Sequence, residues 1–280
     1  MVKMITIHPL FWMTIGLSIL TGRFREMLLL FLVVLIHELG HAGAARILGW
    51  RINEIVLLPF GGVAVVDEHG NRPLKEELIV ILAGPLQHVW MMGVGATLHY
   101  MGIWNDMFDL FMLHNIMILL FNLLPIWPLD GGKLLFLLYS LRLPFKSAHK
   151  MMLYSSLFCF SLLIILTAIL FPFHLNLWMV IVFLSVSQFK EWKHHPYIYF
   201  RFLLERYSKS FNGKKQVVTI APDMRLNDLL ATFSRGKHYH ILIQDLNIET
   251  DEHFLLEAYF KKIKLPVQWE RYLGKLKKSY

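Results

Sequence analysis

An apolar stretch with a metal-binding motif inside it constrains this 280-residue chain more than any other feature. Residues 27–50 are long and apolar enough to cross a bilayer, whose hydrocarbon core of about 30 Å requires about 20 such residues in a helix. Within this stretch, residues 37–41 read His-Glu-Leu-Gly-His. Ionisable side chains at membrane depth are costly and usually functional. We therefore expect a membrane protein with a polar site between its helices.

The two histidines of this motif, His37 and His41, lie four residues apart, so a helix places them on one face. Two imidazoles at this spacing can bind one zinc ion, and Glu38 beside them can act as a general base. The structural alternative is a polar pair that only forms hydrogen bonds between helices. A catalytic zinc site also needs a third protein ligand and an open position for water, so another ligand must come from elsewhere.

Asp130 is the best candidate for the third ligand. It follows Pro125 and Pro128, which should break the apolar segment 108–139, and it precedes two glycines that permit close backbone approach. A break at membrane depth is tolerated where protein or a water-filled cavity satisfies the freed carbonyls. A metal ion would keep this carboxylate ionised, whereas burial alone would favour its neutral form. The alternative role of Asp130 is a cap or turn residue.

Composition predicts an α-helical polytopic membrane protein, because 56% of the residues are hydrophobic and only 17% are charged. Lysine and arginine gather in the loops after the second, fourth and sixth apolar segments, so both termini should be cytoplasmic. Arg23 and Arg25 disagree with this orientation. Six transmembrane helices are expected, at residues 8–22, 27–49, 78–102, 108–139, 152–171 and 175–190.

The loop between the second and third segments is apolar and rich in β-branched residues. Residues 52–66 surround a Pro-Phe-Gly-Gly sequence at 59–62, which predicts a β-hairpin that dips into the membrane surface. A strand edge beside a protease centre can hold an extended peptide by main-chain hydrogen bonds. The alternative is a hairpin that only packs on the helices.

Three further histidines lie in the third and fourth apolar segments. His88, His99 and His114 could support the metal ligands, but a hydrogen bond between helices is the simpler role for each. Cys159 is the only cysteine, which excludes an intramolecular disulfide and a cysteine-based zinc site.

The last 80 residues are expected to form a separate basic unit. Residues 201–280 have a net charge of +6, whereas residues 1–200 have a net charge of +2. The basic residues are dispersed among acidic ones, which favours anionic lipid headgroups over nucleic acid as the partner. We expect a transmembrane domain at 1–196, a helical linker at 197–210 and a cytosolic domain at 211–280 that ends in a basic tail.

Within this unit the sequence predicts a strand at 216–220, a helix at 226–234, a strand at 239–244 and a helix at 252–260. This order resembles a cystathionine-β-synthase (CBS) domain. The resemblance implies that ATP or another adenosine nucleotide binds between paired copies, and one copy per chain implies a homo-oligomer. A small α/β docking domain for the substrate is the alternative, and no cofactor-binding residue can be assigned.

Two motifs together resemble those of the site-2 protease family of intramembrane zinc metalloproteases. The first is His-Glu-Leu-Gly-His at 37–41, and the second, about 90 residues later, is Asn-x-x-Pro-x-x-Pro-Leu-Asp-Gly at 122–131. The resemblance implies that Zn²⁺ binds to His37, His41 and Asp130. It also implies that Glu38 is the catalytic acid and base, and that Asn122 positions the substrate or the oxyanion.

Over its whole length the chain most resembles a branch of this family that acts in sporulation. This resemblance implies a metalloendopeptidase that removes the pro-sequence of a membrane-associated, inactive sigma-factor precursor. It also implies inhibitory membrane protein partners and a location in the membrane around the forespore, facing the mother-cell cytoplasm. The alternative is a non-catalytic membrane binder or a nucleotide-responsive regulator of membrane partners. Because the base and all three ligands are present, the sequence favours the protease.

Overall fold

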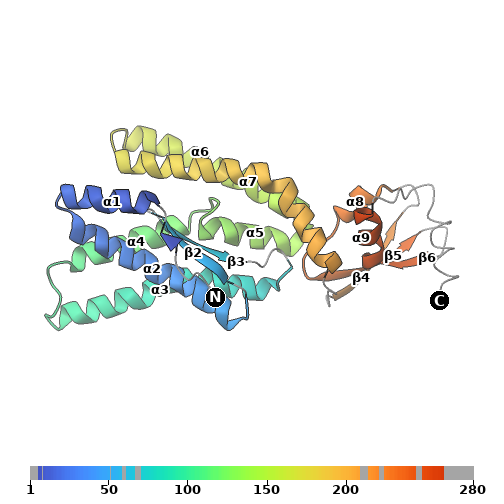
Figure 1. Cartoon of the computed structure of the whole chain (residues 1–280), viewed down its shortest axis with the longest axis horizontal. Helices are drawn as coiled ribbons and strands as arrows, with labels where there is room; N and C mark the ends of the chain where they lie inside the picture. The colour runs from blue at the N-terminus through green and yellow to red at the C-terminus, as the bar shows by residue number, and fades with distance from the viewer. Residues whose placement is uncertain are drawn as a thin grey trace. The chain divides into compact units, whose positions relative to one another are not determined.

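A computed structural model describes residues 6–7, 9–50, 52–58, 61–66, 71–208, 214–220, 224–243 and 248–261. In these ranges the chain is mostly helical, with short strands near the N-terminus and in the C-terminal region (Figure 1). Its residues form two structural units. The first comprises Met1–Glu68, Lys75–Leu137 and Met152–Trp192, and the second comprises His69–Leu74, Leu138–Met151 and Lys193–Tyr280.

The long helices are α1 (Pro9–Leu20), α2 (Phe24–Ile47), α3 (Leu74–Tyr100), α4 (Phe108–Asn122), α5 (Asp130–Arg142), α6 (Phe145–Leu170) and α7 (Leu175–Ser208). Of the described helices, α2, α3 and α6 are long and apolar enough to cross a membrane, and α4 is apolar but shorter. The 12 residues of α1 rise only about 18 Å, which is less than a hydrocarbon core. Six spans therefore stay a prediction. The predicted linker at 197–210 is helical as far as Ser208, where α7 ends, and residues 209–210 lie outside the described residues.

The predicted break in the fourth apolar segment is confirmed. Helix α4 ends at Asn122 and α5 begins at Asp130, with the two prolines in the loop 123–129 between them. Proline lacks a backbone N–H and its ring clashes with the preceding helical turn, so two prolines three residues apart favour a break over one continuous helix.

A three-stranded sheet accompanies the helices of the first unit. Strands β2 (Ile52–Leu58) and β3 (Gly61–Val66) pair antiparallel, and β1 (Thr6–Ile7) adds to β2 in parallel. Strand β1 was not predicted, because its two residues are too few to give a pattern. The turn at 59–60 between β2 and β3 lies outside the described residues. Contact of these two strands with the membrane surface stays a prediction.

The C-terminal sheet has the strand order β4-β5-β6, with β4 parallel to β5 and β6 antiparallel to β5. The predicted helix at 226–234 is shorter than expected, because the chain tightens into a turn after residue 230. Strand β6 was not predicted, since its four residues include three polar ones and form a strand only through pairing. Residue 244, at the end of the predicted strand 239–244, and the basic tail at 262–280 lie outside the described residues. The elements are β4 (Lys214–Ile220), α8 (Leu226–Leu230), β5 (Lys237–Ile243), β6 (Ile248–Asp251) and α9 (Glu252–Phe260).

A buried ion pair joins the end of α7 to this C-terminal sheet. Arg206 Nε lies 2.6 Å from Oε1 of Glu252, and both side chains are almost fully buried. The Arg206 guanidinium also donates to the backbone carbonyls of Ser234 and Lys237. Glu252 accepts a further hydrogen bond from the backbone N–H of Tyr239. Both charges are therefore satisfied, as buried charges must be.

Candidate metal centre

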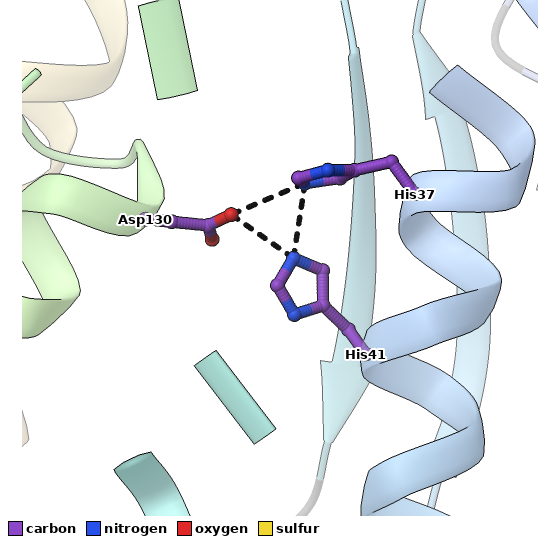
Figure 2. Close-up of side chains that lie close together, drawn as sticks. All are labelled: His37, His41 and Asp130. Carbon is purple, nitrogen blue, oxygen red and sulfur yellow. Dashed lines mark hydrogen bonds and ion pairs between the residues drawn. The ribbon is translucent and has the colours of Figure 1, made fainter. Parts of the chain in front are cut away.

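The three predicted metal ligands meet at one point. His37 and His41 project from the same face of α2, and Asp130 is the first residue of α5 (Figure 2). The Nε2 atoms of the two histidines and Oδ2 of the aspartate form a triangle in which each side is 3.1 Å. All three residues are buried. Atoms of these types at this spacing could hold a metal ion.

The dimensions of this triangle fit zinc. Ligand atoms bound tetrahedrally at about 2.0–2.1 Å lie roughly 3.3 Å from one another. The donor chemistry also fits, because His41 Nδ1 lies 2.7 Å from the backbone oxygen of Val80. A carbonyl oxygen can only accept, so Nδ1 is the protonated nitrogen and Nε2 presents a lone pair. In the neutral ring this lone pair and the carboxylate oxygen 3.1 Å away form the nitrogen and oxygen donor set that a zinc ion accepts.

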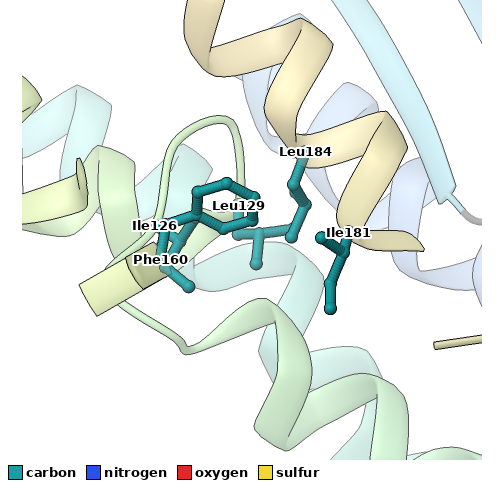
Figure 3. Packing of buried hydrophobic residues seen from close by; sticks show 5 residues of the cluster. All are labelled: Ile126, Leu129, Phe160, Ile181 and Leu184. Carbon is teal, nitrogen blue, oxygen red and sulfur yellow. The ribbon is translucent and has the colours of Figure 1, made fainter. Parts of the chain in front are cut away.

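A loop that is packed on two helices positions Asp130. Ile126 and Leu129 of this loop are buried against Phe160 of α6 and against Ile181 and Leu184 of α7 (Figure 3). Burying aliphatic side chains of this size contributes about 1.5–3 kcal/mol each, so the loop has one preferred position. The apolar contacts therefore fix the place at which α5 begins.

Polar contacts hold the same loop. The Ser156 hydroxyl on α6 accepts hydrogen bonds from the backbone N–H of Trp127, at 2.7 Å, and from the side-chain amide of Gln188 on α7. Ser156 and Gln188 are buried between the helices. Sequence reasoning missed this pair, because Ser156 and Gln188 lie 32 residues apart and neither belongs to a motif.

A lysine holds the second oxygen of the aspartate. Lys133, one turn along α5, donates to Asp130 Oδ1 at 2.9 Å. Oδ2 is therefore the oxygen that faces the histidines. Sequence reasoning missed Lys133, although its spacing of three residues from Asp130 on a helix is a signal that could have revealed it.

Glycines allow α3 to pass directly beside the ligands. A Cβ atom at Gly84 would lie 2.2 Å from His41 Nε2, and one at Gly40 would lie 2.6 Å from the carbonyl oxygen of Ala83. No other residue fits at either position without displacing its neighbour, because only glycine lacks a Cβ atom. The approach of α3 to α2 thus depends on these two positions.

The other predicted site residues have distinct environments. Glu38 is buried on α2 next to His37, and Asn122 is half-buried at the last residue of α4. His88 lies 3.1 Å from His37, measured between His88 Nε2 and His37 Nδ1. His99 stacks on Phe108 instead, with ring centroids 4.1 Å apart.

A second group of possible metal ligands lies in the C-terminal sheet, and sequence reasoning missed it. His238 and His240 are two residues apart on β5 and so share one face of the sheet, and Asp251 lies beside them on β6. His238 Nε2 lies 2.8 Å from Asp251 Oδ1, which is an ordinary hydrogen bond at a partly exposed position. The other ring nitrogen of His238, Nδ1, and Nε2 of His240 are buried without a hydrogen-bond partner among the described residues.

Similar proteins identify the family. The model of peptidase family M50 matches residues 26–103 and 89–166, which include the motif at 37–41 and Asp130. Stage IV sporulation protein FB of Bacillus subtilis is 46% identical over 263 residues, which cover 91% of each chain. A zinc metalloprotease of Methanocaldococcus jannaschii is 38% identical over 134 residues, which cover 43% of this chain and 37% of that protein.

A solved structure agrees with these relatives. The site-2 protease from Methanocaldococcus jannaschii has a TM-score of 0.54 and 30% sequence identity, and the match covers 67% of this chain and 89% of that one. The family predicted from the two motifs is therefore confirmed. The protein is a membrane-bound zinc metalloprotease of the site-2 protease type, and the chain belongs to peptidase family M50.

Proposed function

We propose that this chain hydrolyses a peptide bond of a membrane-associated protein at a zinc ion held by His37, His41 and Asp130. The observation that carries the proposal is the buried triangle of three ligand atoms with sides of 3.1 Å. Zinc, when bound, lowers the pKa of a water ligand to about 7 and polarises the scissile carbonyl.

Glu38 is the proposed general base. It is buried one residue from His37, on the helix that presents both imidazoles. Its carboxylate accepts a proton from the attacking water and returns it to the leaving amine. Asn122 is proposed to position the substrate or to donate a hydrogen bond to the oxyanion. The proposed route for water to these groups is a polar cleft that opens to the cytoplasm.

We further propose that the substrate binds as an extended strand. Strand β3 forms one edge of the sheet β1-β2-β3 and packs beside α2. An edge strand offers unpaired backbone N–H and C=O groups, to which an extended peptide can pair. A substrate held in this way presents an unwound scissile amide to the site.

The proposed substrate is an inactive sigma-factor precursor that loses its pro-sequence in the membrane around the forespore. The similarity to a relative named for stage IV of sporulation, over 91% of both chains, supports a role in sporulation. Inhibitory membrane proteins are the proposed restraint on the enzyme. Six spans with cytoplasmic termini are the proposed topology, which single-cysteine accessibility measurements on a Cys159→Ser background can test.

The C-terminal unit is proposed to be a CBS-like regulatory domain that responds to ATP in a homo-oligomer. The element order β4-α8-β5-β6-α9 supports this assignment. Cleavage rates of the purified enzyme at increasing ATP concentration test the proposal. A rate that does not depend on ATP would leave docking of the substrate as the role of this domain.

Co-expression of the chain with a membrane-associated sigma-factor precursor tests the main proposal. Glu38→Gln should abolish the cleaved product while the purified variant retains one zinc ion per chain. Glu26→Gln is the matched control, because Glu26 lies exposed at the start of the same helix. Cleavage by Glu38→Gln at the wild-type rate would remove this residue from the chemistry.

A further inference from the structure

A chain of buried hydrogen bonds extends outward from His37. His37 Nδ1 lies 3.1 Å from Nε2 of His88 on α3, and His88 Nδ1 lies 3.0 Å from Oδ1 of Asn115 on α4. The Asn115 amide nitrogen then donates to the backbone oxygen of Phe111 at 2.9 Å. His88 and Asn115 are both completely buried, with 0% of their surface exposed. Neither His88 nor Asn115 can therefore exchange its hydrogen-bond partner for bulk water.

The last hydrogen bond fixes the direction of all the others. The backbone oxygen of Phe111 can only accept, so the Asn115 amide nitrogen faces it and Oδ1 faces His88. His88 Nδ1 must then donate, which leaves Nε2 of the neutral ring as an acceptor. His37 Nδ1 must donate to that acceptor, and Nε2 of the neutral His37 ring then presents a lone pair to Asp130 and His41.

We propose that His88 and Asn115 are positioning residues that set the tautomer and the ring orientation of His37 for metal binding. This inference rests on the proposed function, in which His37 is a zinc ligand. Groups that accept a hydrogen bond from a metal-bound histidine fix its orientation and raise its basicity, and their removal typically costs 10–100-fold in metal affinity.

The two histidines of the motif are supported in different ways. His41 donates to the backbone oxygen of Val80, which no side-chain substitution removes. His37 depends instead on two side chains from two other helices. The orientation of His37 can therefore be altered by substitution, and it couples the site to the relative positions of α2, α3 and α4.

Apolar packing holds the same three helices together independently of the hydrogen bonds. Leu29 and Val33 of α2, Met91 of α3 and Phe111 of α4 form one buried cluster. Leucine is close to His88 in volume and has the same branched arrangement of heavy atoms as Asn115, and at either position it adds an apolar side chain to a helix of this cluster. Such variants should fold while losing the directional hydrogen bonds.

The test measures zinc affinity of the purified full-length protein in detergent, by competition with a chelator, and the visible spectrum after cobalt substitution. His88→Leu and Asn115→Leu should each weaken zinc binding about 10–100-fold and change the cobalt spectrum. His88→Gln should restore most of the affinity, because its amide oxygen can accept the His37 proton. His99→Leu is the matched control on the same helix and should behave as the wild type.

The possible outcomes separate this inference from the proposed function. Wild-type zinc affinity and an unchanged cobalt spectrum in His88→Leu, together with loss of zinc in His37→Ala, would overturn the positioning role alone. Retention of zinc at wild-type affinity in His37→Ala would overturn the proposed ligand set and this inference with it. If His88→Leu fails to fold, Asn115→Leu provides the same test, because it leaves His88 in place and removes the acceptor behind it, together with the side-chain donor to the Phe111 carbonyl.

Discussion

Gly84→Ala is expected to weaken the metal site strongly by adding one methyl group. The new Cβ atom would lie 2.2 Å from His41 Nε2 and 2.4 Å from His41 Cε1, whereas ordinary contact begins near 3.4 Å. The overlap is therefore about 1.2 Å by subtraction, and one of the two groups must move by about that distance. The backbone of α3 is held by its own hydrogen bonds, so the His41 ring is the group that moves.

The expected loss of affinity follows from this displacement. Functional geometry must hold to within about 0.5 Å, and misplacement by 1 Å can cost about 100-fold. A movement of His41 Nε2 by about 1 Å is large against triangle sides of 3.1 Å. We therefore expect Gly84→Ala to weaken zinc binding at least about 100-fold, which corresponds to about 2.8 kcal/mol.

Gly93→Ala is the matched control for this experiment. Gly93 lies on the same helix, and a Cβ atom there would meet nothing within 4 Å. Alanine is favoured over glycine in a helix by about 1 kcal/mol, so this variant should be as stable as the wild type or more stable. Zinc affinity is measured for both variants by chelator competition. An affinity of Gly84→Ala within about threefold of that of Gly93→Ala would refute the steric argument.

Three other predictions follow from the same structure. Ser156→Ala removes the acceptor shared by Trp127 and Gln188 and should lower stability by about 1–3 kcal/mol in thermal unfolding; an unchanged melting temperature would argue against these hydrogen bonds. Arg206→Met leaves Glu252 buried without its partner and should destabilise the C-terminal domain by about 3–5 kcal/mol, whereas the double variant Arg206→Met/Glu252→Leu should cost less. Hydrogen exchange of α9 measures both, and equal exchange in the wild type and the single variant would contradict the prediction. A zinc chelator should abolish cleavage, and added zinc should restore it; cleavage that persists after zinc is removed would exclude a metal-dependent reaction.

Local sequence patterns determined the two metal-binding histidines, the helix break before the third ligand and most of the C-terminal elements. The spacing of His37 and His41 follows from the 3.6-residue period of a helix, and the structure places both on one face of α2. The chemistry of proline determined the break before Asp130, and an ionisable residue beside that break marked it as a candidate ligand. The strands β4 and β5 and the helices α8 and α9 near the C-terminus could also be predicted from local patterns of apolar residues. Strand β6 was not predicted, because its pairing with β5 defines it and its own residues do not.

Only the tertiary structure decided which residues support the site. His88 and His99 lie on one helix and look alike in the sequence, yet His88 contacts His37 and His99 stacks on Phe108. The two histidines are 11 residues apart, so they lie on nearly the same face of α3 but about 16 Å apart along its axis. The difference therefore depends on where along its length α3 approaches α2, which is at Gly84, where no side chain intervenes. Local spacing fixes which side chains share a face of one helix, because backbone geometry alone sets that period. The partner that each face meets depends on packing between segments distant in the chain, which no local pattern records.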